Sequence, residues 1–508
     1  MSVRELKHNA ERPAGYAALI EWFKIMAPPP WHKSVIAERG GPQRTVLNEF
    51  VYEVYPRSYW PGDGVVEHLE FALKYDGVNL ALLAEIFARA DIEEITGWIK
   101  SKPTGKYARC IWYLYEFLSG DHLPLDDVKP CGYVNLLDAE RYVTSNSPLA
   151  VPRQRIKDNL LGNAKFCPVI RRTPVLEKWI AGTLARRCHD LAEKYPAETF
   201  RRALGYLYTK ETKSSFEIEN ITPDAARTER YVTLLQLAER EDFCAKAKLI
   251  ELQTRIVDSR FAAADYRTVQ NYIGESVRIG RQRVHYVCPK PGDVHGLMEG
   301  LIACHQRLAA GGVHPVLHAT LIGYGFVYVH PFEDGNGRIH RFLIHNILAQ
   351  RKFSPSGFIL PVSAAMLHDP AAYDRSLEAF SRAIQPFLEY SLDEQGVMTV
   401  SGDTSRWYRY MDMTNQAEAL FDFIERALEY ELPDELDFVA SYDRAKNRIQ
   451  AIIDLPDRRL DTFIRLCLVN AGRLSATKRR SHFNGLTDDE INAMEQVVQA
   501  EFKSHNKL

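Results

Sequence analysis

Residues 330–341 read His-Pro-Phe-Glu-Asp-Gly-Asn-Gly-Arg-Ile-His-Arg, and this segment constrains the surrounding fold more than any other part of the chain. Two glycines flank an asparagine directly ahead of apolar residues spaced by three and four positions, namely Ile339, Phe342, Leu343 and Ile347. That spacing is typical of the buried face of a helix. We therefore expect a loop that begins at His330 and a helix that begins at the glycines.

The residue types in this segment suit the binding of a polyphosphate. A helix N-terminus offers unpaired N–H groups and a partial positive charge, and glycines let a phosphate approach the backbone. Arg338 and Arg341 are three residues apart, so both lie on one face of the expected helix and can hold phosphate oxygens. Asp334 is the kind of carboxylate that Mg²⁺ takes as one of few protein ligands. His330 titrates near neutral pH and could accept a proton from an attacking hydroxyl.

A second apolar pattern precedes the segment. Pro315 can start a helix, and several residues that follow it are apolar: Val316, Leu317, Leu321, Ile322 and Phe326. A helix that is apolar over most of its surface is expected in the centre of a core. This helix would deliver His330 at its C-terminal end.

Taken singly, a histidine before a proline and a Gly-Asn-Gly turn are usually structural. The whole segment, however, resembles the Fic family signature His-Pro-Phe-x-Asp/Glu-Gly-Asn-Gly-Arg-x-x-Arg and matches it at every fixed position. Members of that family transfer a nucleotide monophosphate, most often AMP from ATP, to a Ser, Thr or Tyr hydroxyl of a protein. The resemblance implies a mainly α-helical, Fic-type protein adenylyltransferase that uses ATP with Mg²⁺.

The resemblance also implies a role for each matched residue. His330 would be the general base, and Asp334 would hold Mg²⁺ at the α- and β-phosphates. The anion hole around the phosphates would be formed by the backbone of Gly335, Asn336 and Gly337. An in-line phosphoryl displacement needs this kind of positioning and charge neutralisation more than covalent help from the protein.

Two arginines and one glycine complete the implied site. Arg338 would neutralise charge on the departing pyrophosphate, and Arg341 would clamp the γ-phosphate. In the branch that resembles the kinase-like toxin Doc, the second glycine of the signature is typically lysine, and ATP binds the other way round. Gly337 is intact here, which implies the AMP-transferring orientation.

An upstream segment, Ser-Phe-Glu-Ile-Glu-Asn at 215–220, resembles the inhibitory pattern Ser/Thr-x-x-x-Glu-Gly/Asn of the family. The fixed positions are Ser215, Glu219 and Asn220, on an inhibitory helix expected at about 205–220. Glu219 would pair with Arg341 and occupy the guanidinium that the γ-phosphate needs. The resting enzyme would then be autoinhibited.

The segment at about 280–288 resembles the β-hairpin flap with which the family holds its target by strand addition. Its β-branched and aromatic residues suit a short strand closed by prolines, and the expected docking residues are Val284, His285, Tyr286 and Val287. An ordinary surface hairpin is the alternative. Further on, Tyr373 lies where family members often place an aromatic ring against adenine.

The resemblance covers residues 176–395, which we expect to form the Fic core. Residues 1–175 should form a mostly helical N-terminal domain of unknown role, and residues 396–508 a helical C-terminal domain. The expected fold class is mainly α, with a small β-hairpin flap on the Fic-type core. Apart from this core, no activity can be assigned from the sequence.

Composition limits the classes of function. The chain of 508 residues has 46% hydrophobic and 26% charged residues and a formal net charge of −2, which is ordinary for a globular protein. This charge argues against a general nucleic-acid or membrane binder. No run approaches the roughly 20 apolar residues of a membrane span, and the first residues do not resemble a signal peptide. We expect a cytoplasmic protein whose eight cysteines are reduced.

One basic stretch keeps a nucleic-acid partner open, although a solvated face is favoured. It contains Arg153, Arg155, Lys157, Lys165, Arg171 and Arg172. Two other functions compete with autoinhibited AMP transfer to a target protein and to the chain itself. One is the removal of AMP from a modified protein by the same site, and the other is a nucleotide-sensing, DNA-associated regulator. The target protein is unknown, and a homo-oligomer stays open.

Overall fold

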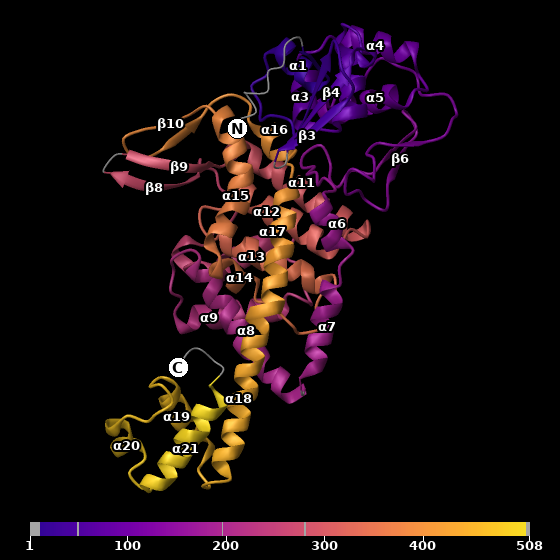
Figure 1. The fold of residues 1–508 in the computed structure, drawn as a ribbon. Coiled ribbons are helices and arrows are strands. Elements are labelled where there is room, and N and C mark those ends of the chain that lie inside the picture. The colour runs from indigo at the N-terminus through magenta and orange to yellow at the C-terminus, as the bar shows by residue number, and fades with distance from the viewer. Residues whose placement is uncertain (1–10, 48–49, 196, 279–280, 504–508) are drawn as a thin grey trace. The chain divides into compact units, whose positions relative to one another are not determined.

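The computed structural model describes residues 11–47, 50–195, 197–278 and 281–503 (Figure 1). The chain forms two compact units that alternate along the sequence. The first unit contains Met1–Ile180, Phe243–Ile344 and Asp374–Ala419. The second unit contains Ala181–Asp242, His345–Tyr373 and Leu420–Leu508. The fold is mainly helical with small sheets, which confirms the expected fold class.

The N-terminal part of the first unit contains a four-stranded sheet with the order β1-β2-β4-β3. Strands β2 and β4 are parallel, and the other neighbours are antiparallel. The strands are β1 (Glu11–Ala14), β2 (His32–Ala37), β3 (Gln43–Leu47) and β4 (Phe50–Pro56). The accompanying helices are α1 (Tyr16–Phe23), η2 (Arg57–Tyr59), α2 (Val65–Phe71), η3 (Ala72–Asp76), α3 (Leu80–Phe87), α4 (Ile92–Ser101) and α5 (Lys106–Ser119).

A three-stranded sheet follows with the order β5-β7-β6, formed by β5 (Val134–Asn135), β6 (Leu149–Val151) and β7 (Ile156–Asp158). The N-terminal region is therefore less helical than we expected. Strands β5 to β7 are too short to show the period of two that marks a strand in a sequence. Strand β4 carries β-branched and aromatic residues, but they lie between loop signals; in the sheet β4 pairs with β3, which directly precedes it, and in parallel with β2.

The remainder of the first unit surrounds one central helix, α12 (Pro315–Val329), in which every residue from Val316 to Val329 is buried. This confirms the expected buried helix that starts at Pro315. The other elements of this part of the chain are α6 (Pro174–Ile180), α10 (Lys246–Ile256), η4 (Ser259–Phe261), β8 (Tyr272–Arg278), β9 (Arg281–Val287), α11 (Pro291–Ala310), α15 (Pro370–Ile384), η5 (Gln385–Phe387), β10 (Tyr390–Leu392), β11 (Met398–Val400), α16 (Ser405–Arg409) and α17 (Thr414–Arg426). Helix α11 packs against α12. Helix α13 (Asn336–Gln350) begins at the glycine-flanked asparagine, as expected.

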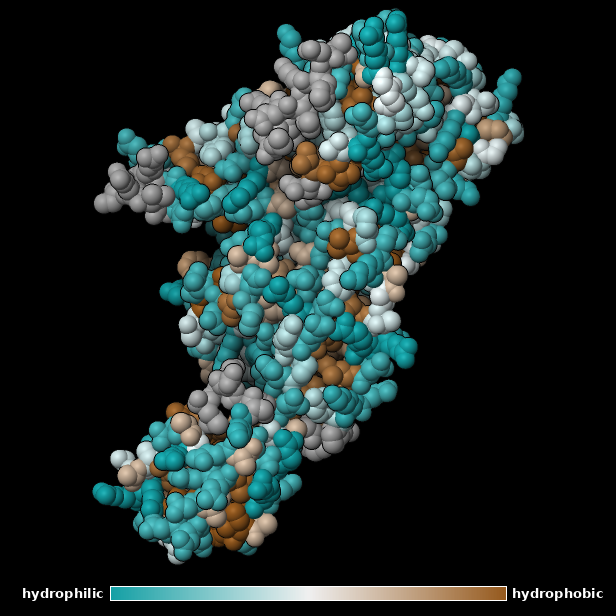
Figure 2. Space-filling model, in the orientation of Figure 1, coloured by the Kyte–Doolittle hydropathy of each residue, from teal (hydrophilic) through white to brown (hydrophobic). Residues whose placement is uncertain are grey.

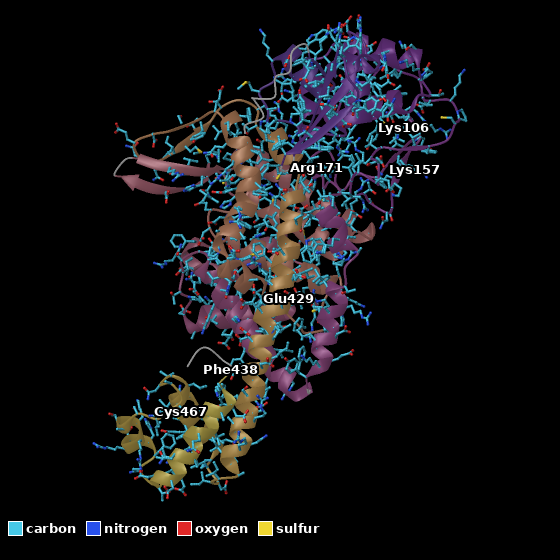
Figure 3. All side chains as sticks on the ribbon, viewed as in Figure 1. Lys106, Lys157, Arg171, Glu429, Phe438 and Cys467 are labelled. Carbon is cyan, nitrogen blue, oxygen red and sulfur yellow. The ribbon has the colours of Figure 1, made fainter. Side chains whose placement is uncertain are left out.

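The second unit is helical. Helix α8 packs against α9, α14 and α18. Its elements are α7 (Leu184–Lys194), α8 (Ala197–Glu217), α9 (Ala225–Leu237), α14 (Val362–His368), η6 (Ala427–Glu431), α18 (Leu432–Gln450), α19 (Asp457–Leu468), α20 (Ala476–His482) and α21 (Asp488–Glu501). Cys467 belongs to the apolar core that the C-terminal helices share (Figure 3). The capping box of Thr487 and Glu490 opens α21.

Within the described residues, no helix has the length and apolar character needed to cross a bilayer. The visible face in Figure 2 is mostly hydrophilic, with hydrophobic residues in small patches. All eight cysteines are free thiols, as expected. In the basic stretch, four residues form ion pairs within the first unit: Arg153 with Glu116 and Asp127, Lys165 with Glu299, Arg171 with Asp412, and Arg172 with Glu177 (Arg171 is labelled in Figure 3).

Candidate active site

His330 ends the central helix α12. Its N–H donates to the carbonyl of Phe326 at 2.9 Å, and its backbone is left-handed with φ 51°. The ring Nδ1 lies 3.1 Å from the carbonyl oxygen of Val327. A proton on Nδ1 would be donated to this carbonyl, which leaves the lone pair on Nε2. This contact fixes the orientation of the ring, and the role of His330 as a general base stays a prediction.

The loop after His330 is closed by one asparagine. The Asn336 side chain is 2% exposed; its Nδ2 donates to the Phe332 carbonyl at 2.7 Å, and its Oδ1 accepts from the Phe332 N–H at 3.1 Å. The Phe332 ring is fully buried and packs near Tyr266 and Phe326. Asn336 thus shapes the loop through its side chain, whereas we expected only its backbone to act in the anion hole.

The turn at Gly335, which we predict to bind phosphate, has the left-handed backbone that favours glycine. Gly335 has φ +93°, and a Cβ atom there would lie 2.9 Å from Val257 Cγ1, so a larger residue would clash. The Gly335 N–H donates to Asp334 Oδ1 at 2.6 Å, and Arg338 Nη2 donates to the same oxygen at 2.7 Å. The Asp334 side chain remains 49% exposed. A half-exposed carboxylate and a cation therefore meet at the start of α13.

Both arginines of the segment are buried. Arg338 and Arg341 are each 1% exposed, and Arg338 Nη1 also contacts the Ile256 carbonyl at 3.4 Å. Both arginines lie in the first two turns of α13, and that they hold phosphate oxygens stays a prediction. Gly337 precedes both arginines and is the second residue of α13.

Two buried side chains that the sequence did not single out support this loop. Arg267 donates from Nε to the His330 carbonyl at 2.7 Å, and its N–H donates to the Pro331 carbonyl at 2.8 Å. Gln253 Nε2 donates to the carbonyls of Phe261 at 3.0 Å and Asp334 at 3.4 Å. Neither residue belongs to a local motif, because both act across more than 60 positions of sequence. Only the fold reveals them.

The predicted flap is a β-hairpin in which β8 pairs with β9 antiparallel (Figure 1). Ile273 pairs with Tyr286 and Gly274 with Val284, so His285 is the extra residue of a β-bulge. Residue 280 of the predicted flap lies outside the described residues.

The four predicted docking residues differ in burial. Val284 and His285 are half-buried, whereas Tyr286 and Val287 are 6% and 1% exposed. Tyr286 donates its hydroxyl to the Tyr328 carbonyl at the end of α12, and burial raises its pKa well above the usual value. Tyr286 and Val287 therefore anchor the hairpin, and their side chains cannot face a target. Docking through the backbone and through Val284 and His285 stays a prediction.

The predicted inhibitory segment lies in the second unit. Helix α8 ends at Glu217, earlier than the expected end at about 220, and Glu219 is exposed in the turn that follows. Ser215 is buried, and its Oγ lies 3.3 Å from the Tyr231 hydroxyl on α9. Asn220 has φ 56°, a left-handed conformation that only glycine and asparagine adopt readily. That backbone explains why the pattern ends in Gly or Asn. The pairing of Glu219 with Arg341 stays a prediction.

Tyr373, the predicted adenine-stacking residue, is 6% exposed at the end of a segment of the second unit. Its ring centroid lies 6.4 Å from that of Phe423 in a perpendicular arrangement. Contact with adenine stays a prediction for this residue.

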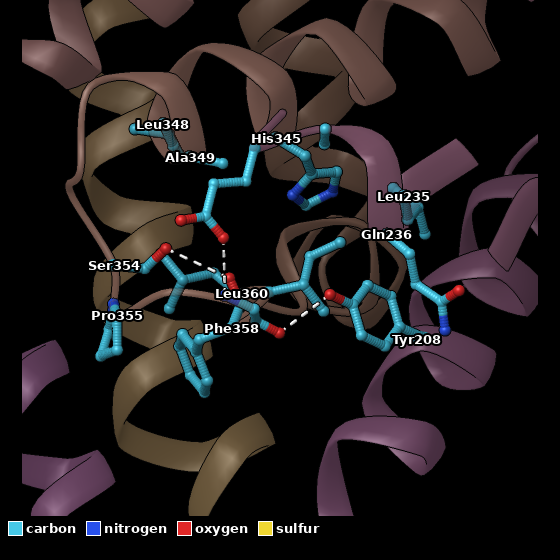
Figure 4. Close-up of a pocket in the computed structure, with 14 residues that line it drawn as sticks. Tyr208, Leu235, Gln236, His345, Leu348, Ala349, Ser354, Pro355, Phe358 and Leu360 are labelled. Atoms are coloured by element: carbon cyan, nitrogen blue, oxygen red, sulfur yellow. Dashed lines mark hydrogen bonds between the residues drawn. The ribbon is translucent and has the colours of Figure 1, made fainter. Parts of the chain in front are cut away.

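The second unit also contains a small pocket lined by α8, α9, the end of α13 and the segment that precedes α14 (Figure 4). His345 lines it, together with Tyr208, whose hydroxyl donates to the Gly357 carbonyl at 2.8 Å. Next to it, the fully buried Glu211 lies 2.6 Å from His345 Nε2 and accepts from the Ser363 N–H at 2.9 Å. This buried pair connects α8 to α13 and to the first turn of α14.

Comparison with known proteins shows similarity over part of the chain. Residues 243–348 match the model of the Fic/DOC family. Two curated relatives, each a protein adenylyltransferase Fic, come from Culex quinquefasciatus and Aedes aegypti; they are 28% identical to this chain over 162 and 159 residues. Each alignment covers 31% of this chain and 29% of the relative, so the chain spans less than a third of the length of these relatives.

A solved Fic family protein from Desulfovibrio desulfuricans G20 is 20% identical, with a TM-score of 0.36, over 66% of this chain and 87% of the other. The family model covers the elements from α10 to α13, and thus the hairpin, the central helix and the loop that carries His330.

Proposed function

The chain belongs to the Fic/DOC family through residues 243–348, and from this premise we propose that it transfers AMP from ATP to a hydroxyl group of a protein. The observation that carries the proposal is the arrangement at the junction of α12 and α13. There, an oriented histidine, a glycine turn at a helix N-terminus and a carboxylate lie within one loop. The proposal gains support from the names of the curated relatives, which are protein adenylyltransferases.

In the proposed reaction, the hydroxyl oxygen of the target attacks the α-phosphorus of ATP, and the bond to the β-phosphate oxygen breaks. His330 accepts the hydroxyl proton, and pyrophosphate leaves. The contact between Nδ1 and the Val327 carbonyl fixes the ring, so that Nε2 is the atom that receives the proton. The N–H groups at the start of α13 would stabilise negative charge on the phosphoryl oxygens.

The donor set at this site fits Mg²⁺. Asp334 is a half-exposed carboxylate, and within the described residues no group of three or more His, Cys, Asp or Glu side chains could enclose a metal. Mg²⁺ commonly binds through one or two carboxylates and the phosphates of its substrate, which matches a single Asp. When bound, the ion would neutralise charge on the α- and β-phosphates. Asp334 would hold it, and Arg338, which now pairs with Asp334, would turn toward the pyrophosphate.

We further propose that Glu219 holds the enzyme in an inhibited state by pairing with Arg341. Support comes from the match to the inhibitory pattern and from the left-handed Asn220, which fixes the turn that carries Glu219. A carboxylate on Arg341 would exclude the γ-phosphate from the same guanidinium. Self-modification and a cytoplasmic location, where ATP is available, belong to the same proposal.

A labelling experiment tests the proposed reaction. The purified chain is incubated with a cell extract, Mg²⁺ and ATP that carries the label either in the α-phosphate or in the γ-phosphate. AMP transfer predicts that proteins gain only the α-label. Gain of the γ-label would indicate phosphorylation instead. Release of AMP from a previously modified protein, without any gain of label, would favour AMP removal by the same site.

A further inference from the structure

The guanidinium of Arg267 is buried and makes hydrogen bonds to three different parts of the backbone. Arg267 is 3% exposed. Nε donates to the His330 carbonyl at 2.7 Å, Nη1 to the Val269 carbonyl at 2.8 Å and Nη2 to the Pro289 carbonyl at 2.6 Å. Together with the bond from its N–H to Pro331, one residue binds both sides of the His330–Pro331 junction.

This charge is buried at a cost to stability. Burial lowers the pKa of Arg267, and the ionisable groups that act on it within the described residues are Cys288, Tyr286 and Tyr408, none of which is a carboxylate. An unpaired buried cation is expensive unless its donors are satisfied. If the position served only to fill space, a neutral side chain would have a smaller free-energy cost of burial. The planar guanidinium group of arginine, by contrast, presents several N–H donors in fixed directions and can therefore bind several carbonyls at once.

The carbonyls that Arg267 binds belong to two functional parts of the site. His330 is the proposed general base, held in a left-handed conformation at the end of α12. Pro289 follows β9 and thus closes the hairpin. The two ends of the hairpin are joined by the Cys288 N–H, which donates to the Asn271 carbonyl at 3.2 Å, and by Gln270 Nε2, which donates to the Cys288 carbonyl at 2.8 Å. A single guanidinium therefore links the base of the hairpin to the base of the catalytic loop.

We propose that Arg267 is a positioning residue, which sets the place of the His330 imidazole relative to the hairpin that holds the target hydroxyl. This inference rests on the proposed AMP transfer. Arg267 touches neither nucleotide nor target, and its effect passes through the backbone of His330. A small displacement of a catalytic group can lower the rate on the order of 10²-fold, while the binding of a substrate elsewhere is unaffected.

The test compares Arg267→Lys and Arg267→Met with wild type. Lysine keeps the charge, but its compact ammonium cannot serve three carbonyls in a fixed fork. We expect kcat for AMP transfer to fall about 10²-fold in both variants, with the Kd for ATP within about twofold of wild type. Hydrogen exchange at the hairpin amides of residues 272–275 and 284–287 should become faster, because opening of the hairpin base no longer breaks the bond to Arg267.

Arg260→Ala is the matched control, because this arginine lies seven residues away and pairs with Asp258 on the surface with a side chain that is 77% exposed. It should change neither measurement. Wild-type kcat in a folded Arg267→Lys variant, or unchanged hairpin exchange, would overturn the inference. If wild type transfers no AMP, the proposed function fails, but faster hairpin exchange in the variants would still support the link that Arg267 makes.

Discussion

At the scale of single residues, the backbone conformation of His330 determines where its side chain lies. A left-handed conformation is uncommon for a residue with a Cβ atom, and here it turns the chain sharply from α12 into the loop. The same turn brings Nδ1 to the Val327 carbonyl and so selects the nitrogen that can accept a proton. The position of the proposed base is therefore a consequence of how α12 ends.

We predict that His330→Ala lowers AMP transfer by ~10²- to 10⁴-fold, the usual effect of removing a general base. ATP binding should persist, because the imidazole acts on the hydroxyl proton and does not hold phosphates. The two quantities are measured as transfer rate and Kd for ATP. His122→Ala, at an exposed histidine that pairs with Glu116, is the control. A transfer rate within a few-fold of wild type would remove His330 from the mechanism.

Asp334→Ala should abolish transfer as well, because the proposed metal loses its protein carboxylate and Arg338 loses its partner. The measurement is the transfer rate as a function of Mg²⁺ concentration. A variant that keeps both its rate and its Mg²⁺ dependence would show that the metal binds elsewhere.

The sequence indicates these residues as candidates, but it does not indicate their surroundings. The loop segment was predictable because its residues are contiguous, and a local pattern can report on them. The burial of Arg338 and Arg341 depends on elements such as α10, and the contacts of Arg267 span the hairpin and the loop. Contacts between segments far apart in the chain have no signature in a local pattern.

At the scale of elements, helices α12 and α13 were predictable from apolar spacing and from their start signals, a proline and a glycine turn. The hairpin was predictable only in its second strand, because β9 has β-branched and aromatic residues, whereas β8 contains Gly274 and several polar residues. The end of α8 was expected at about 220 but lies at Glu217, and the turn that follows contains Asn220 with a left-handed backbone.

This turn leads to a prediction for Glu219. If its carboxylate occupies Arg341, Glu219→Gly should raise AMP transfer, including self-modification, because the inhibited state loses the contact that distinguishes it from the competent state. The loss of one charge-assisted pair, worth ~1.5–3 kcal/mol, corresponds to roughly a ten- to hundredfold gain.

Glu217→Gly is the control for Glu219→Gly, because Glu217 is also exposed and is the last residue of α8. Equal activation by both variants would indicate a general loosening of the helix end. The absence of activation by Glu219→Gly would contradict the inhibition by this residue, and loss of AMP release in that variant would favour the removal reaction.

The buried pair of Glu211 and His345 gives a prediction about stability. Glu211→Ala leaves His345 and the Ser363 N–H without their partner, and breaking a buried pair on one side costs about 3–5 kcal/mol. Denaturant unfolding measures this loss. Lys213→Ala, an exposed position on the same helix, should change stability little. A loss below about 1 kcal/mol would show that water replaces the carboxylate in the pocket nearby.

At the scale of the whole molecule, the two compact units do not follow the order of the sequence. Each unit is assembled from three segments, and α13, α15 and α17 each contain a boundary between units. We predicted three consecutive regions, 1–175, 176–395 and 396–508. A sequence pattern shows where composition changes along the chain, but it does not show which distant segments pack together. Their use as independent domains stays a prediction.

The catalytic loop and the predicted inhibitory turn belong to different units, the first and the second respectively. The proposed inhibition by Glu219 and the proposed proton transfer at His330 can be tested separately. A variant at Glu219 changes only the inhibition, whereas a variant at His330 removes the transfer of AMP.

The most direct measurement is the intact mass of the full chain after incubation with Mg²⁺ and ATP, for Glu219→Gly and for Glu219→Gly combined with His330→Ala. AMP transfer to the chain itself predicts that Glu219→Gly gains the mass of one or more AMP groups, and that the double variant gains none. If neither Glu219→Gly nor wild type acquires AMP, on itself or on any protein of an added cell extract, the central claim that this chain is an AMP-transferring enzyme is contradicted.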